Sequence, residues 1–211
     1  MNNSPEANKL LKLFLNPFQF IAGANALLIG IIIIILASVV GYTVNCRFDG
    51  LIDVHSGLLE HRASYMVFIT EGLGNWLVLA FILTLSARIV TKSKYRIIDI
   101  FGTTALARYP YFFIPLINLI PGFNRYTQYI AAKYIPNTAA ITIYPVDLPL
   151  FIIGIICILF LSIYSVILMY RAFSVSCNAR GKKAIWYFII VCVVVEILTK
   201  LLSYGVSIAF K

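Results

Sequence analysis

Charged residues are scarce in this chain. Only 12% of its 211 residues are Asp, Glu, Lys or Arg, whereas 61% are hydrophobic. A soluble domain of this size carries about twice that share of charge. The apolar residues also come in long uncharged blocks, clearest over 21–42 and 148–170. Each block is long enough for the roughly 20 residues that cross a hydrocarbon core of about 30 Å. The composition therefore indicates an integral membrane protein.

The sequence also lacks the motifs of the common enzyme classes. It has no Gly-rich phosphate loop, no nucleophile elbow around a serine, and no Cys–His arrangement with telling spacing. The four cysteines show no metal-ligand spacing. We expect no disulfide, because Cys46 and Cys177 fall on opposite membrane faces in the topology below. We therefore predict a non-enzymatic protein with no catalytic residue, no cofactor and no metal.

Five apolar segments predict an all-α, polytopic transmembrane helical bundle. The spans are expected at about 21–42, 73–90, 97–120, 148–170 and 184–208. Residues 1–20 form an expected amphipathic cytoplasmic segment, which Asn16 and Pro17 end before the first span. Residues 21–211 form one expected membrane domain, because no polar stretch is long enough for a second.

Two residue patterns describe the inside of this bundle. Ala22, Ala26 and Gly30 recur every four residues in the first span, and small residues on one stripe let helix backbones approach closely. Pro110 and Pro115 lie in the third span, where prolines free carbonyl groups that neighbours must satisfy. The third span is therefore predicted to be kinked or partly unwound.

The basic residues predict the orientation. Ten Lys and Arg residues lie in the N-terminal segment, in the turn 88–96 and in the loop 171–183, against five in the longer segments of the other side. The denser side is cytoplasmic by the positive-inside rule. The N-terminus is thus expected in the cytoplasm and the C-terminus outside. The net charge of +9 then indicates contact with anionic lipid headgroups, at about 1 kcal/mol per basic residue, and no nucleic acid.

Ionisable residues at membrane depth are the candidate site. Arg108 lies eleven residues past the start of the third span and Glu196 twelve past the start of the fifth. At 1.5 Å per residue both sit roughly 17 Å into the bilayer, so we expect an Arg108–Glu196 ion pair. Lys200, one turn after Glu196, is a competing partner, and Asp99 in the third span completes the set. Such a group either fixes helix register or lines a polar cavity or ion path.

The connection 45–70 carries residue types that bind metals, namely Asp49, Asp53, His55, Glu60 and His61. The two histidines are six residues apart, whereas four places both on one helical face in a zinc site. We interpret the group as a solvated loop. A metal-dependent intramembrane enzyme is one alternative function for the chain, and it requires this loop to fold onto the bundle.

The layout resembles the Yip domain family (Ypt-interacting proteins), in its bacterial branch. The likeness rests on Asn16, Pro17 and Phe18 before the first span, and on Asn75 and Trp76 in the second. It also rests on the stretch 107–110, Ala-Arg-Tyr-Pro, followed by Pro115 in the third span. The eukaryotic members act in trafficking through Rab-type GTPases, with a long cytosolic tail and an Asp-Leu-Tyr-Gly-Pro motif. This chain has neither feature, so that role is not carried over.

The resemblance implies a multi-pass protein of the bacterial cytoplasmic (inner) membrane, with no catalytic residues to transfer. Two functions follow as hypotheses. The first is a helical bundle that organises the membrane, protein partners or copies of itself. The alternative is a small transporter or channel that uses Arg108, Glu196 and Lys200. Water reaching the level of Glu196 favours transport, and a dry, fully paired core favours the structural role.

Overall fold

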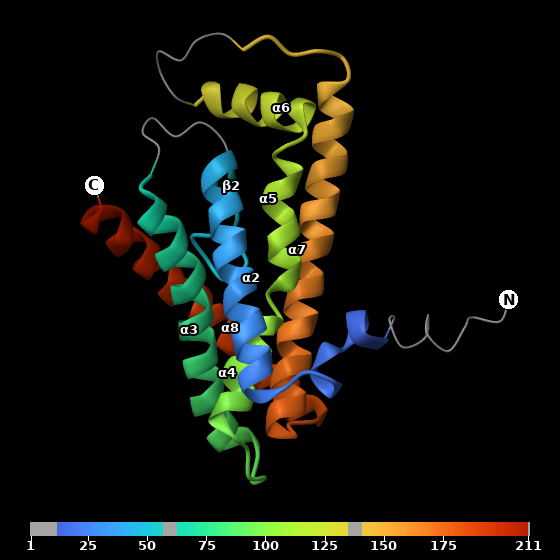
Figure 1. The fold of residues 1–211 in the computed structure, drawn as a ribbon, viewed down its shortest axis with the longest axis vertical. Helices are drawn as coiled ribbons and strands as arrows, with labels where there is room; N and C mark the ends of the chain where they lie inside the picture. The colour runs from blue at the N-terminus through green and yellow to red at the C-terminus, as the bar shows by residue number, and fades with distance from the viewer. Residues whose placement is uncertain (1–11, 57–62, 135–140, 211) are drawn as a thin grey trace, which may run out of the picture.

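The computed structural model describes residues 12–56, 63–134 and 141–210. Within them, four helices are long and apolar enough to cross a membrane: α2 (Gly23–Val44), α3 (Tyr65–Val90), α7 (Asp147–Cys177) and α8 (Gly181–Ala209). The only strands in the described ranges are β1 (Cys46–Arg47) and β2 (His55–Ser56), which pair antiparallel. The predicted all-α membrane helical bundle is thereby confirmed (Figure 1).

The third apolar segment is broken, as its prolines predicted. It consists of α4 (Ile97–Leu106), the 3₁₀ turn η2 (Tyr109–Phe112) and the short α5 (Phe113–Ile117). Pro110 and Pro115 have no amide hydrogen to donate to the helical ladder, so the helix cannot continue regularly past Leu106. Figure 1 shows α4 near the lower end and α5 continuing towards α6 (Pro121–Ala132), which lies across the upper end. None of these pieces is long enough by itself to count as a span.

Two long helices extend beyond their predicted spans. α3 begins at Tyr65, eight residues before the expected 73, with Ser64 as its N-cap. The apolar run 66–69 continues the helix, and Glu71 does not interrupt it because that carboxylate is buried against other parts of the bundle. α7 continues to Cys177, well past the predicted 170, before Asn178 adopts a left-handed conformation.

The closest packing in the bundle joins α2 to α4. Ala26 is fully buried, and a Cβ added to Gly30 would lie 2.5 Å from Ala105. On the α4 side, a Cβ at Gly102 would lie 2.4 Å from the carbonyl oxygen of Gly23. The stripe of small residues in α2 therefore allows the two helix backbones to touch.

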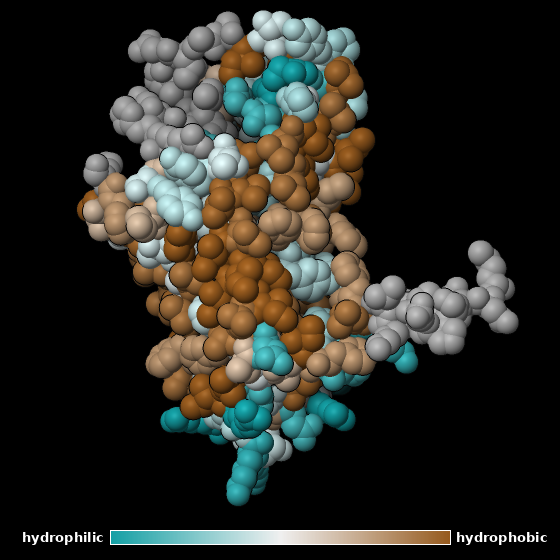
Figure 2. All heavy atoms as spheres, viewed as in Figure 1, coloured by the Kyte–Doolittle hydropathy of each residue, from teal (hydrophilic) through white to brown (hydrophobic). Residues whose placement is uncertain are grey.

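The two ends of the bundle differ in charge. The described N-terminal residues, the α3–α4 turn and the α7–α8 turn lie at the lower end (Figure 1), where Figure 2 shows teal side chains below a brown apolar belt. Residues 12–15 are helical, followed by η1 (Pro17–Gln19). The Phe14 ring stacks on Tyr164 of α7 at 5.4 Å, and Arg171 donates to the carbonyl of Leu15. The segment before α2 is thus fastened to α7. The part of the expected amphipathic segment before residue 12 lies outside the described residues.

Candidate functional site

Residues 46–56, which we call the inserted hairpin, fold back between the helices and bury their centre. Phe48 and Leu51 are 5% and 0% exposed. Asn75 of α3 donates from Nδ2 to the carbonyls of Phe48, at 2.6 Å, and Gly50, at 2.8 Å. Tyr111 of η2 donates its hydroxyl to the Leu51 carbonyl at 2.9 Å. Backbone groups of a non-helical segment are thus satisfied by side chains of the bundle, as buried backbone groups require.

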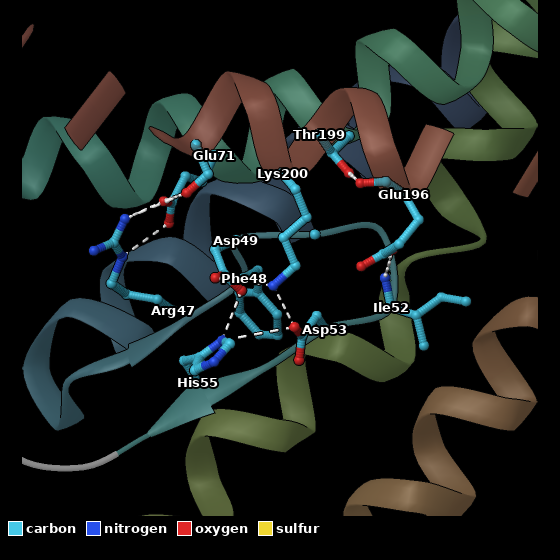
Figure 3. Close-up of polar contacts among 12 residues, drawn as sticks. Arg47, Phe48, Asp49, Ile52, Asp53, His55, Glu71, Glu196, Thr199 and Lys200 are labelled. Atoms are coloured by element: carbon cyan, nitrogen blue, oxygen red, sulfur yellow. Dashed lines mark hydrogen bonds and ion pairs between the residues drawn. The ribbon is translucent and has the colours of Figure 1, made fainter. Parts of the chain in front are cut away.

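The first polar cluster joins β1 to α3 and α8. Arg47 pairs with Glu71, whose side chain is only 1% exposed. Glu71 also accepts a hydrogen bond from Ser203, and Arg47 donates to Ser207 at 2.9 Å. Figure 3 shows the Arg47–Glu71 contact beside α8. A buried carboxylate is therefore compensated by one cation and one hydroxyl.

The second polar cluster joins the inserted hairpin to Lys200 of α8. The Lys200 ammonium donates to Asp49 at 3.1 Å and also binds Asp53. His55 Nδ1 lies 2.8 Å from Asp49 and 3.8 Å from Asp53 (Figure 3). The hydrogen bond with Asp49 raises the pKa of His55 above its usual value. Burial alone would raise the pKa of Asp49, but the hydrogen bonds from His55 and Lys200 lower it to about 2.

Glu196 binds the inserted hairpin and does not bind Arg108. Its Oε2 accepts the backbone N–H of Ile52 at 3.0 Å (Figure 3). The ion pairs among the described residues do not include Arg108 with Glu196, or Lys200 with Glu196. The expected Arg108–Glu196 ion pair therefore does not form. Two residues at the same depth can still point in different directions from their helix axes. Here the inserted hairpin lies between the two segments that carry Arg108 and Glu196.

Arg108 is buried at the break of the third segment. Arg108 is only 3% exposed, and its Nη1 has no hydrogen-bond partner in the described structure. The guanidinium lies 4.8 Å from the centre of the Tyr111 ring, and Glu196 is near enough to attract it electrostatically. Arg108 also lines a void of about 10 Å³ together with Ser38 and Gly72. That volume is about the size of one water molecule.

Asp99 lies apart from these clusters. It sits in the first turn of α4, 3.8 Å from Arg96 at the basic end of the bundle. The structure therefore brings Glu196 and Lys200 to the inserted hairpin, leaves Arg108 at the neighbouring helix break, and places Asp99 at the other end of α4.

Three candidate metal ligands do come together. Single ligand atoms of Asp49, Asp53 and His55 lie within 4.8 Å of one another. This carboxylate–imidazole set is one that divalent metals accept, and the Lys200 ammonium already contacts both carboxylates. Glu60 and His61, the other two candidates from the sequence, lie outside the described residues. The loop folds onto the bundle over 46–56, as the enzyme alternative required.

Arg47 and Glu71 were not predicted as site residues from the sequence. Arg47 reads as a charge in the connection after the first span, and Glu71 reads as the edge of the second span. A signal for the site was nevertheless present in α8. Four of its polar residues recur every three to four positions on one helical face, and each of the four contacts the inserted hairpin or Glu71. They are Glu196, Lys200, Ser203 and Ser207.

Comparison of the chain with protein-family models, curated proteins and solved structures finds no match. The resemblance to the Yip domain family therefore stays a prediction.

Proposed function

We propose that this chain is a non-enzymatic membrane protein that crosses the bilayer five times and organises membrane or protein partners. In this proposal it resembles the Yip domain family and lies in a bacterial cytoplasmic membrane. The observation that carries the proposal is what the charged residues of α3 and α8 bind. Glu71, Glu196 and Lys200 all bind the inserted hairpin of the same chain. They are therefore engaged in holding the fold, which leaves them unavailable to a passing solute.

Five crossings are supported by the broken third segment, which runs between the two ends of the bundle in Figure 1. They are also supported by the position of the basic segments, which share the lower end and would face the cytoplasm. The test is labelling of intact cells with an impermeant thiol reagent, in a background that lacks the exposed Cys157. Cysteine at Lys133 should be labelled and cysteine at Lys182 spared. The reverse pattern would invert the topology.

The organising role predicts a protein neighbour along the lipid-facing side of α7. Cys157 is an exposed native thiol on that side. Oxidative crosslinking in native membranes should therefore give one discrete adduct, with itself or with a partner, that Cys157→Ser abolishes. Cysteine placed at Val193, on the exposed side of α8, serves as a matched position in the Cys157→Ser background. Adducts of many sizes, formed with equal intensity from both cysteine positions, would indicate random collisions in the membrane and no specific neighbour.

A second function, transport, is favoured by one specific observation. Arg108 is buried at a helix break with an unpartnered nitrogen, and broken helices bear the substrate sites of many transporters. Proteoliposomes under an imposed ion or proton gradient separate the two proposals. The organising role predicts the same leak as protein-free vesicles. A flux that Arg108→Gln abolishes, with the fold intact, would overturn it in favour of transport.

A further inference from the structure

A groove lies beneath α6, on the side of the bundle away from α8. Its volume is about 330 Å³. α6 contributes Phe123, Thr127, Ile130 and Ala131, which recur on one helical face. Its other walls are α7, through Phe151, Ile155 and Ile158, and the inserted hairpin. In extended backbone such as residues 53–56, which lead into and include β2, successive side chains alternate in direction. Val54 and Ser56 therefore reach the groove, while Asp53 binds Lys200 and His55 binds Asp49 on the other side.

The groove offers water almost nothing to bind. Its two hydroxyl groups are already engaged, because Thr127 donates to the Phe123 carbonyl at 2.9 Å and Ser56 contacts Cys46 and accepts from Asn118. The remaining lining is hydrocarbon or aromatic. A groove lined mainly in this way favours the apolar groups of a ligand over water. The volume also falls within the range of small-molecule sites, about 300–1,000 Å³.

The position of the groove identifies the apolar molecule as a membrane lipid. Ile155 is 45% exposed, and the same side of α7 includes Ile152, Ile156 and Leu159, all exposed. Figure 2 shows this side as a brown column below the paler residues of α6. The groove is thus open towards the surface that touches acyl chains. Its roof, α6, carries tyrosines of the kind found at headgroup level.

Charge at the end of α6 favours an anionic headgroup. Arg125 is occupied, because it binds Asp147 through two nitrogens at 2.6 and 3.0 Å. Lys133 follows the lining residues Ile130 and Ala131 at the C-cap of the helix, and it is exposed. Its Nζ rests 4.4 Å above the Tyr129 ring, and no ion pair between described residues involves it. A lipid phosphate near α6 would therefore find one available cation.

We propose that this groove is a phospholipid site: one acyl chain lies under α6, and an anionic phosphate headgroup lies at Lys133. The lipid belongs to the leaflet that contains α6. It would add to the existing contacts between α6 and α7, which include the Arg125–Asp147 pair and the stacked rings of Phe123 and Phe151, with centres 5.6 Å apart.

The experiment uses the full chain in nanodiscs that contain phosphatidylglycerol with a photoactivatable group on its acyl chain. After irradiation, the labelled peptides are mapped by mass spectrometry. Ile155→Trp fills the groove, whereas Ile156→Trp, the next residue on α7 and 60% exposed, adds the same bulk on the open lipid surface. Ala131→Phe fills the groove from the α6 side, so the result does not depend on a single variant. Thermal unfolding shows which variants keep the fold.

Label is expected on α6 and on Phe151–Ile158 of α7, retained in Ile156→Trp and lost in folded Ile155→Trp and Ala131→Phe. Lys133→Gln should lower the preference for phosphatidylglycerol over phosphatidylcholine by about fivefold, without moving the label. Label spread evenly along α7, or equal in Ile155→Trp and Ile156→Trp, would overturn the site. Equal labelling by the two lipids in the unaltered protein would overturn the anionic headgroup.

Discussion

Replacing Glu71 by Gln should destabilise this protein more than replacing any charge that the sequence singled out. Glu71 is 1% exposed and its partner Arg47 is 15% exposed. Removing one member of a buried ion pair costs about 3–5 kcal/mol, because the other keeps its desolvation penalty. Arg47 retains some access to solvent, so the lower end applies, about 3 kcal/mol. Gln keeps an acceptor for Ser203, so the loss in the free energy of unfolding is due to the missing charge.

The matched control is Lys200→Met in the neighbouring cluster. Lys200 is 38% exposed, and its partners Asp49 and Asp53 are 22% and 41% exposed. Solvent screens such pairs, which are worth about 1 kcal/mol or less. The assay is equilibrium unfolding in mixed micelles by increasing fractions of sodium dodecyl sulfate, followed by circular dichroism. The free energy of unfolding should fall roughly three times as far in Glu71→Gln as in Lys200→Met.

A double-mutant cycle isolates the Arg47–Glu71 interaction. Arg47→Gln with Glu71→Gln removes both charges, so the double variant should cost less than the sum of the single variants by more than about 1 kcal/mol. Strict additivity, or a loss in Glu71→Gln no larger than in Lys200→Met, would refute the claim that this pair is the main electrostatic contact of the inserted hairpin.

Three further outcomes are expected. Glu196→Gln keeps an acceptor for the Ile52 N–H and should cost under about 1 kcal/mol in the same unfolding assay, whereas Glu196→Leu leaves that donor unsatisfied and should cost about 1–3 kcal/mol. Because the pKa of His55 is raised, its protonated form stabilises the fold below the usual pKa of about 6.5, and this stabilisation is lost as pH rises through the raised value. Because the pKa of Asp49 is lowered, its ionised form stabilises the fold above about pH 4, and this stabilisation is lost as pH falls towards 2. Unfolding midpoints should therefore peak between about pH 4 and 6.5, with the alkaline decline absent in His55→Gln. Gly102→Val should force α2 away from α4 and cost about 1–3 kcal/mol; a midpoint equal to that of the unaltered protein would contradict the close approach.

Local features of the sequence predicted the elements of this fold well. Long uncharged blocks produce α2 and α7 because a helix satisfies the backbone hydrogen bonds of a single segment within lipid. Pro110 and Pro115 predicted the broken third segment because they act on their own helix and depend little on distant contacts. The small residues of α2 likewise predicted a close helix contact, though not that α4 would be the partner.

The arrangement of the polar groups was much less predictable. The expected Arg108–Glu196 pair rested on a regular rise of about 1.5 Å per residue along both spans and on a solvated connection after the first span. The structure instead places residues 46–56 between those helices, and Glu196 binds the backbone of Ile52. Contacts between residues so far apart in the sequence depend on how the whole bundle closes. Only the polar face of α8, from Glu196 to Ser207, was visible beforehand as a sign that something polar would lie against it.

The attachment of the inserted hairpin to α8 has a consequence for biosynthesis. α8 is translated after α2, α3 and α7, and chains enter the membrane from the N-terminal end. Until α8 arrives, Asp49 and Asp53 have no ammonium partner, and the Glu71 carboxylate lacks Ser203. Insertion of the early helices and completion of the polar core are thus separate events in time. A nascent chain that stalls before α8 would hold the hairpin through α3 and η2 alone, with the acidic pair Asp49 and Asp53 still lacking the Lys200 ammonium.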